Sequence, residues 1–273
     1  MIIKKLSAAL VLCFALFSTH AQAVILTDIV FVVDESGSMG NVQTNLRNNI
    51  GLFASILEGT GQVSAQFGLV GYGASLSSSK PRMLTDFTDP TTFSTAAQNL
   101  VASGGTEPGY LATAYALNAV DGQSNLFSYR SNAVKNIIIL TDEDNDTVFG
   151  SGSTVGGLGV TEAIVDQLLT SNNALYNGVL SGGAPNSYSQ LITDHSGTVF
   201  NLNTFNSTDQ QVVENFVTAF ANTKLQETLD RCQLNPNDPA CNPTSVSEPS
   251  SFALLALGLA GMISVRLRKM KAA

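Results

Sequence analysis

The sequence predicts an α/β fold in which helices cover both faces of a doubly wound, mainly parallel sheet. Apolar runs of strand length alternate along the chain with segments of helical period, the order typical of strand–helix–strand units. Two largely apolar segments, residues 29–33 and 134–141, have the length of buried strands, and an aspartate follows each of them, Asp34 and Asp142. In such sheets, ligands bind beyond the carboxyl ends of the strands.

The helices follow from apolar periodicity and from their terminal residues. Residues 41–58 repeat apolar side chains near the 3.6-residue period, and glycines end this helix. Pro90 and Pro108 stand in the first turns of two further helices, where a missing N–H costs nothing. Thr208 and Gln211 form a capping box before the last one. We expect helices at 41–58, 90–101, 108–120, 161–169, 187–194 and 208–230.

The strands are short apolar runs bounded by polar or glycine-rich segments. Residues 82–87 follow the polar loop 75–81 and predict a short antiparallel edge strand. Residues 142–159 form a long polar loop, and loops of this length are usually functional or mobile. We expect strands at 29–34, 63–72, 82–87, 134–141, 175–180 and 198–202.

Both ends of the chain carry export features. Residues 1–23 have two lysines, an apolar stretch and the small-residue pattern Ala21-Gln22-Ala23, which predicts a secretory signal peptide. A second apolar run, 252–265, would reach only ~21 Å as a helix, short of a hydrocarbon core of roughly 30 Å. The basic residues after it should stay cytoplasmic. We therefore expect transient membrane insertion by a short C-terminal transmembrane helix.

Charge and cysteines limit the partners and the compartment. Without the basic residues of the two terminal segments, acidic residues outnumber basic ones by 21 to seven, so the net charge is near −14. Nucleic acid is therefore excluded as a partner. Cys232 and Cys241 are the only cysteines beyond the signal peptide, and an oxidising compartment favours a disulfide between them.

Three segments contain oxygen donors suited to one divalent cation. The first is the Asp34-x-Ser36-x-Ser38 turn, which joins one carboxylate to two hydroxyls. The second is the glycine-rich stretch that leads to Thr106, and the third ends at Asp142. Hard cations such as Mg²⁺ bind oxygen donors and take few protein carboxylates.

In this order, the three segments resemble the von Willebrand factor type A domain family and its metal-ion-dependent adhesion site (MIDAS). The resemblance covers residues 26–225 and implies a Rossmann-like fold. It also implies that Mg²⁺, or else Mn²⁺ or Ca²⁺, is the cofactor. The metal ligands that it implies are Asp34, Ser36, Ser38, Thr106 and Asp142.

Other acidic residues lie next to these positions in the sequence. Glu35, Glu107 and Asp144 are candidate residues of the rim of the metal cleft. The run 142–146 departs from an EF-hand, because Thr147 stands where glycine is required and Ser153 where a bidentate glutamate is required. Whether this run binds a second ion stays open.

Before the C-terminal apolar run, Glu248 and Pro249 resemble the PEP-CTERM sorting signal of Gram-negative bacteria, although Ser247 replaces its first proline. That resemblance implies an exosortase as an export partner, in addition to the signal peptidase that the Ala21-Gln22-Ala23 pattern predicts. It places the protein in the periplasm, on the outer surface or in the extracellular matrix. The predicted organisation is a signal peptide (1–23), a type A domain (24–231), a disulfide-closed linker (232–249) and a sorting signal (250–273).

The leading functional prediction is a non-enzymatic adhesion or matrix protein. Its metal would accept a carboxylate from a protein or an acidic polysaccharide. One alternative is a metal-assisted hydrolase that uses Glu35, Glu107 or Glu143 as general base. Another is a passive matrix component in which the metal only rigidifies loops. A Ser-His-Asp hydrolase that uses His195 would need a serine framed by Gly-x-Ser-x-Gly, and the sequence has none. We therefore expect His195 to be a surface residue.

Overall fold

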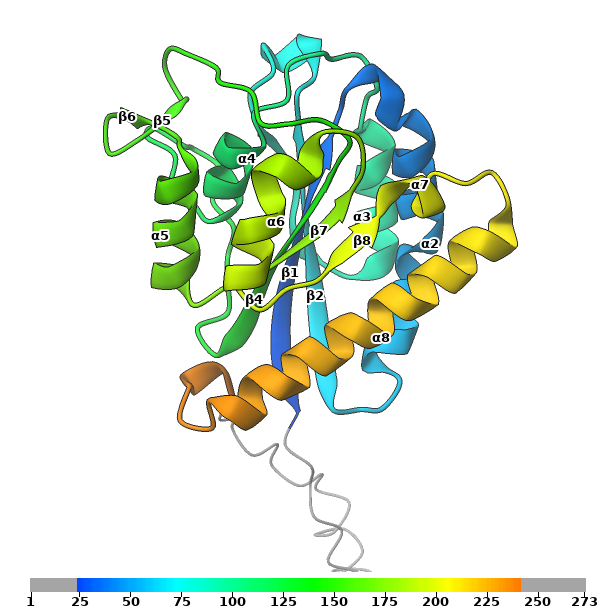
Figure 1. The fold of residues 1–273 in the computed structure, drawn as a ribbon. Coiled ribbons are helices and arrows are strands. Elements are labelled where there is room, and N and C mark those ends of the chain that lie inside the picture. The colour runs from blue at the N-terminus through cyan, green and yellow to red at the C-terminus, as the bar shows by residue number, and fades with distance from the viewer. Residues whose placement is uncertain (1–23, 242–273) are drawn as a thin grey trace, which may run out of the picture. The chain divides into compact units, whose positions relative to one another are not determined.

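A computed structural model of the chain describes residues 24–241. The predicted signal peptide, Glu248 and Pro249, and the C-terminal apolar run lie outside these residues. Within them, a six-stranded sheet has the order β3-β2-β1-β4-β7-β8, and only β3 is antiparallel to its neighbour. The predicted doubly wound, mainly parallel sheet with one antiparallel edge strand is confirmed (Figure 1).

The strands of this sheet lie close to the predicted positions. Their bounds are β1 Ile25–Asp34, β2 Val63–Tyr72, β3 Arg82–Thr88, β4 Ala133–Thr141, β7 Leu175–Leu180 and β8 Val199–Asn201. A separate antiparallel pair, β5 Thr154–Val155 and β6 Leu158–Gly159, lies inside the segment predicted to be a loop. The Asp121 carboxylate accepts hydrogen bonds from Gly156 and Gly157 in the turn of this pair.

The helices differ from expectation mainly at their ends. Their bounds are α2 Gly40–Glu58, α3 Pro90–Ala96, α4 Gly109–Ala116, α5 Glu162–Asn172, α6 Ala184–Asp194, α7 Leu202–Phe205 and α8 Gln210–Leu234, with 3₁₀ turns η1 Gly37–Met39, η2 Ser75–Ser77, η3 Ala97–Asn99 and η4 Pro239–Cys241. Helix α4 stops early because Asn118 takes a positive φ of 61°. The predicted capping box is wrong: Asp209 caps α8 and accepts the Gln211 N–H at 2.9 Å.

Alternate side chains of β1 pack against the two helical layers. Phe31 and Val33 join the core beneath α2, α3 and α8, whereas Val30 and Val32 join the core beneath α4, α5 and α6. A strand buried on both faces has to be apolar throughout, which explains the continuous run in the sequence. Within the described residues, no helix is long and apolar enough to cross a membrane.

A buried ion pair and a disulfide hold the opposite end of the sheet from Asp34. Asp28 is fully buried in β1, and the backbone N–H and Nε of Arg130 each donate to its carboxylate at 2.7 Å. Cys232 and Cys241 are joined by a disulfide that ties η4 to the end of α8. The amino-terminal end of the central strands is therefore fastened independently of the other end.

Arg130→Met should lower the free energy of unfolding by about 3–5 kcal/mol, because it leaves the Asp28 carboxylate buried without its cation. Urea unfolding measures this loss. Arg47→Met on α2 is the matched control and should change stability by less than about 1 kcal/mol. Equal losses in the two variants would contradict this role of the ion pair.

Candidate metal centre

Asp34 ends β1 and joins the two central strands. Its side chain is fully buried, its Oδ1 accepts the Ser36 N–H at 2.6 Å and its Oδ2 accepts the Thr141 hydroxyl at 2.8 Å. Burial raises the pKa of Asp34 to about 6, although the bonds from Ser36 and Thr141 oppose this shift. The hydrogen bonds therefore fix the position of the carboxylate but do not fully offset the cost of burying its negative charge.

Two serine hydroxyls extend from Asp34 toward Asp142. Ser36 Oγ lies 3.1 Å from Ser38 Oγ, and Ser38 Oγ donates to Asp142 Oδ1 at 3.1 Å. Ser36 is only 4% exposed, whereas Ser38 is exposed and Asp142 is half-buried. Four predicted ligands thus form one continuous set of polar contacts, which opens to solvent at Ser38.

The glycine-rich loop is held against the same turn by its backbone. The Ser103 and Gly104 N–H groups donate to the Glu35 carbonyl at 2.9 and 3.0 Å, and Gly37 N–H donates to the Gly104 carbonyl at 3.3 Å. A Cβ on Gly104 would lie 1.8 Å from the Gly73 carbonyl oxygen, so only glycine fits there.

Thr106 lies on this loop beside Gly73. A Cβ placed on Gly73 would lie 3.3 Å from the Thr106 carbonyl oxygen and 3.4 Å from Asp34 Oδ1, so the Thr106 backbone is close to the Asp34 carboxylate. Its hydroxyl makes no hydrogen bond with another described residue. The role of Thr106 as a metal ligand stays a prediction.

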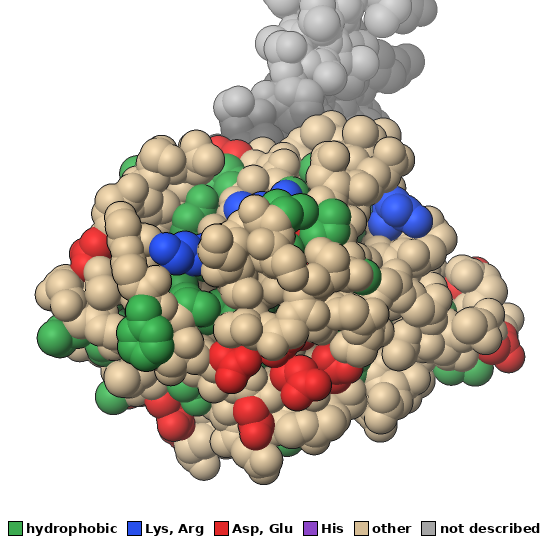
Figure 2. Space-filling model, turned by 90° about the horizontal axis from the view of Figure 1, so that it is seen from above, with side chains coloured by type: hydrophobic (Ala, Val, Ile, Leu, Met, Phe, Trp, Pro, Cys, Tyr) green, Lys and Arg blue, Asp and Glu red, His purple; other side chains and the backbone are tan. Residues whose placement is uncertain are grey.

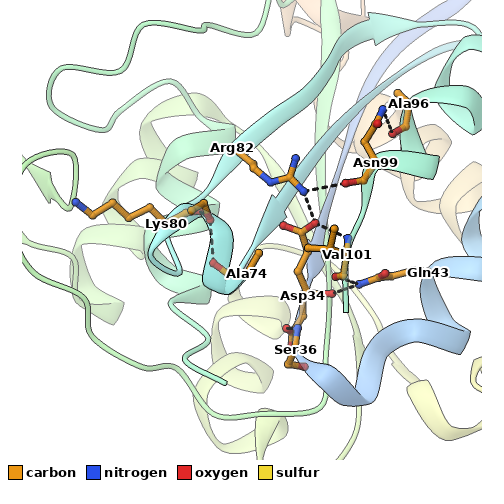
Figure 3. A network of polar contacts seen from close by, with 11 residues as sticks. Asp34, Ser36, Gln43, Ala74, Lys80, Arg82, Ala96, Asn99 and Val101 are labelled. Carbon is orange, nitrogen blue, oxygen red and sulfur yellow. Dashed lines mark hydrogen bonds and ion pairs between the residues drawn. The ribbon is translucent and has the colours of Figure 1, made fainter. Parts of the chain in front are cut away.

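Glu35 does not lie at the rim, and that expectation is wrong. Its side chain is fully buried against Gly71 of β2, and its Oε1 accepts hydrogen bonds from Arg82 at 2.5 Å and from the Val101 N–H at 2.9 Å; Figure 3 labels these two donors. The Gln43 side chain bonds the Asp34 and Val101 carbonyls at 3.0 and 2.9 Å. Glu35 and Gln43 therefore fasten the metal turn to the segment that leads into the glycine-rich loop.

Glu107 lies behind the site and not on an open rim. It is 5% exposed, and burial, together with the charges of Asp34, Asp146 and Glu143, raises its pKa to about 7. A buried carboxylate next to other carboxylates favours the protonated form unless a cation is near. The electrostatics of the site would therefore be relieved by a bound cation.

The acidic loop after Asp142 bonds to the start of α4 and lies against the start of α6. Asp146 Oδ2 accepts the Glu107 N–H at 3.1 Å, and Asn145 Oδ1 accepts the Tyr110 N–H of α4 at 2.8 Å. Asp144 lies against Gly183 at the start of α6, since a Cβ on Gly183 would be 3.0 Å from its carboxylate. These side chains therefore contact the starts of α4 and α6. Their spacing in the sequence did not predict these contacts.

Viewed onto this end of the molecule, acidic side chains gather near the middle of the face, apart from the few lysines and arginines (Figure 2). Among the described residues, no group of three or more His, Cys, Asp or Glu side chains is arranged to hold a metal. The contact set of Asp34, Ser36, Ser38 and Asp142 instead mixes two carboxylates with two hydroxyls. All its donors are oxygens, which fits a hard cation such as Mg²⁺. A second ion at residues 142–146 has no support among the described residues.

The comparison with family models decides the family. The model of the von Willebrand factor type A domain matches residues 28–237. The chain belongs to this family. A second model, the PEP-CTERM protein-sorting motif, matches residues 245–269, so both resemblances found in the sequence are confirmed.

Among solved structures, the chain is similar to a minor pilin of Streptococcus sanguinis, PilB, and to a point mutant of it. Each pilin is 14% identical to this type A chain. Both matches cover 76% of this chain and 63% of the pilin chain, with TM-scores of 0.46 for PilB and 0.48 for the mutant. The type A chain therefore spans less than two thirds of the pilin's length. No curated protein matches it.

Gly104→Ala should destabilise the type A domain by about 1–3 kcal/mol, because its Cβ would collide with the Gly73 carbonyl. Urea unfolding measures this. Gly105→Ala is the matched control: a Cβ there meets no atom within 4 Å, and its stability should stay within about 0.5 kcal/mol of wild type. Loop packing is refuted as the reason for Gly104 if both variants unfold alike.

The pKa of Asp34 predicts a pH dependence of stability in the presence of chelator. Its folded pKa of about 6 exceeds the ordinary aspartate value of 3.8, so the folded state binds this proton more tightly. Its contribution to the unfolding free energy is complete below pH 4 and falls by on the order of 2–3 kcal/mol as the pH rises through 6. Urea unfolding from pH 4 to 7.5 should show this fall relative to Asp34→Asn, whose amide does not titrate. Parallel profiles for the two proteins would contradict the raised pKa.

Proposed function

We propose that this exported type A domain protein binds a divalent cation through Asp34, Ser36, Ser38, Thr106 and Asp142. The supporting observation is the unbroken set of contacts from the buried Asp34 to the exposed Ser38 and the half-buried Asp142. Mg²⁺ is the proposed ion, with Mn²⁺ or Ca²⁺ as alternatives. A cation held by few carboxylates remains electrophilic and supplies an open position for a further oxygen donor.

The proposed role of the cation is adhesion or matrix attachment. A carboxylate of a partner protein or of an acidic polysaccharide would complete the coordination. The surrounding acidic residues Glu143, Asp144 and Asp146 oppose a purely anionic ligand, so a partner with cationic groups beside its carboxylate fits this surface better. The acidity of the chain also argues against nucleic acid as a partner.

The PEP-CTERM motif indicates that the protein is exported to the cell surface and processed by an exosortase. We propose a Gram-negative host, removal of residues 1–23 by signal peptidase, and transient insertion of the C-terminal segment into the inner membrane. These steps would deliver the type A domain to the periplasmic or outer side. There, divalent cations and extracellular polymers would be accessible to the site.

A metal-assisted hydrolase remains the alternative from a different functional class. Glu107 is the observation in its favour, because its pKa of about 7 suits a general base at neutral pH. Its burial argues against direct access to a water on an open metal face, and the pairing with Arg82 removes Glu35 as a candidate. Adhesion is therefore the better-supported function.

Calorimetric titration of residues 24–243, which form one compact unit, tests the metal site. Wild type should bind Mg²⁺ and Mn²⁺ saturably, and Asp142→Asn should bind at least about 100-fold more weakly, because it removes a charged ligand. Asp166→Asn on α5 removes an exposed carboxylate elsewhere and should bind as wild type does. Failure of the wild type to bind Mg²⁺, Mn²⁺ or Ca²⁺ would refute the proposal. Saturable binding that only raises the melting temperature would instead favour the passive matrix role.

A further inference from the structure

A lysine is fully buried between the C-terminal helix and the sheet, in a cluster unrelated to the metal centre. Lys224 of α8 is 0% exposed, and its Nζ contacts Asn177 Oδ1 in β7 and lies 2.8 Å from the Glu227 carboxylate. The rings of Phe200 and Phe220 stand 5.4 and 5.3 Å from Nζ. The three polar side chains therefore meet in an enclosed and largely apolar setting.

The surroundings of Lys224 suit an amine nucleophile. Burial lowers its pKa to about 8, although Glu227 opposes this shift. A desolvated lysine next to a carboxylate has an accessible neutral amine and a base to accept its proton. Lysine nucleophiles in enzymes are activated in this way.

The surroundings of Asn177 suit an electrophile. Its Oδ1 also accepts the Thr198 backbone N–H at 2.8 Å, and its Nδ2 donates to Asn136 Oδ1 at 2.9 Å. A backbone N–H that donates to a carbonyl oxygen stabilises the negative charge formed there on nucleophilic attack. Fixing both reactants in contact supplies the orientation that a reaction between two separate molecules lacks.

We propose that Lys224 and Asn177 form an intramolecular isopeptide bond. The Nζ lone pair attacks Cγ of Asn177, and the new C–N bond replaces the bond from Cγ to Nδ2. Glu227 takes one proton from Nζ and delivers it to the departing nitrogen, which leaves as ammonia. Nothing is oxidised or reduced, and no co-reactant is required.

This bond would join the last long helix to the sheet covalently. Helix α8 packs over α2 and ends at the disulfide, so two covalent links would hold it, one to β7 and one to η4. For an exported protein, the expected consequence is resistance to local unfolding and proteolysis at this helix. The link would also remove the cost of burying an ammonium group.

A second lysine and asparagine pair provides an internal control. Lys135 Nζ donates to Asn172 Oδ1 at 2.8 Å, but this lysine is only half-buried, and the Asp28 carboxylate that acts on its charge is bound by Arg130. Proximity of an amine to a carboxamide is thus common to both pairs, whereas Lys224 adds full burial and a hydrogen bond from its amine to the Glu227 carboxylate. The control pair should remain unlinked.

Tryptic mapping of the full chain, denatured and reduced, tests the proposal directly. Between Asn136 and Arg231, trypsin has one site, after Lys224. The isopeptide predicts a single peptide, 136–231, uncleaved at Lys224 and lighter than its sequence mass by one ammonia, about 17 Da. A second protease that cuts between 177 and 224 should then yield a branched peptide containing both residues.

Loss of ammonia alone does not establish the bond, because Asn177-Gly178 also loses ammonia on succinimide formation. Succinimide formation leaves Lys224 cleavable, so separate peptides 136–224 and 225–231 would overturn the proposal whatever the mass of the first. Glu227→Gln should give these separate peptides, because it removes the base while preserving side-chain size. A link that persists in this variant would contradict the role of Glu227, and a link at Lys135 would contradict the requirement for burial and a base.

Discussion

The functional site depends on the two hydrogen bonds that the buried Asp34 carboxylate accepts where β1 ends. One of its oxygens bonds to the turn that follows β1, and the other bonds to the last residue of β4. It is buried at the boundary between two hydrophobic layers, where an ionised group is costly without compensation. The fold tolerates it because a neighbouring hydroxyl and a backbone N–H group satisfy its oxygens, and the proposed cation would neutralise its charge.

The rest of the fold positions the groups around Asp34. Parallel pairing of β1 with β2 and β4 brings their carboxyl ends to one edge. The ion pair between the buried Glu35 and the partly exposed Arg82 then fastens edge strand β3 to the turn at residues 34–38, and Gly104 allows the glycine-rich loop to pass against Gly73. The amino-terminal end of the sheet is held by the ion pair between Asp28 and Arg130 and by the disulfide. Loops at the carboxyl ends of the strands can therefore adapt to a ligand without loosening the core.

Most of the sheet could be predicted from the sequence because strands buried on both faces are apolar throughout. Strands β2 and β7 have the expected bounds, and the edge position of β3 follows from its mixed character. The β5 and β6 pair escaped prediction because it is short and exposed, and its turn is held by Asp121, far away in the sequence. Similarly, Asp209 competed with Thr208 to cap α8, and local sequence does not rank two adjacent caps.

The candidate ligands were predictable as a motif, but the roles of their neighbours were not. Glu35 looked like a solvated rim residue, yet it pairs with Arg82, a partner that only the tertiary fold supplies. Asn145 and Asp146 looked like potential ligands and instead bond to the start of α4. No pattern in the sequence marks Lys224. An amine becomes a candidate nucleophile only once its burial and its contacts with Asn177 and Glu227 are known.

The central claim is that one divalent cation binds where β1 and β4 end. Anomalous diffraction from crystals of the type A domain grown with Mn²⁺ tests it most directly, since it locates the ion without reference to activity or to a partner. The account predicts one strong peak within coordination distance of the Asp34, Ser36, Ser38 and Asp142 side chains. A peak confined to the acidic residues 144–146, or no peak at saturating Mn²⁺, would contradict it.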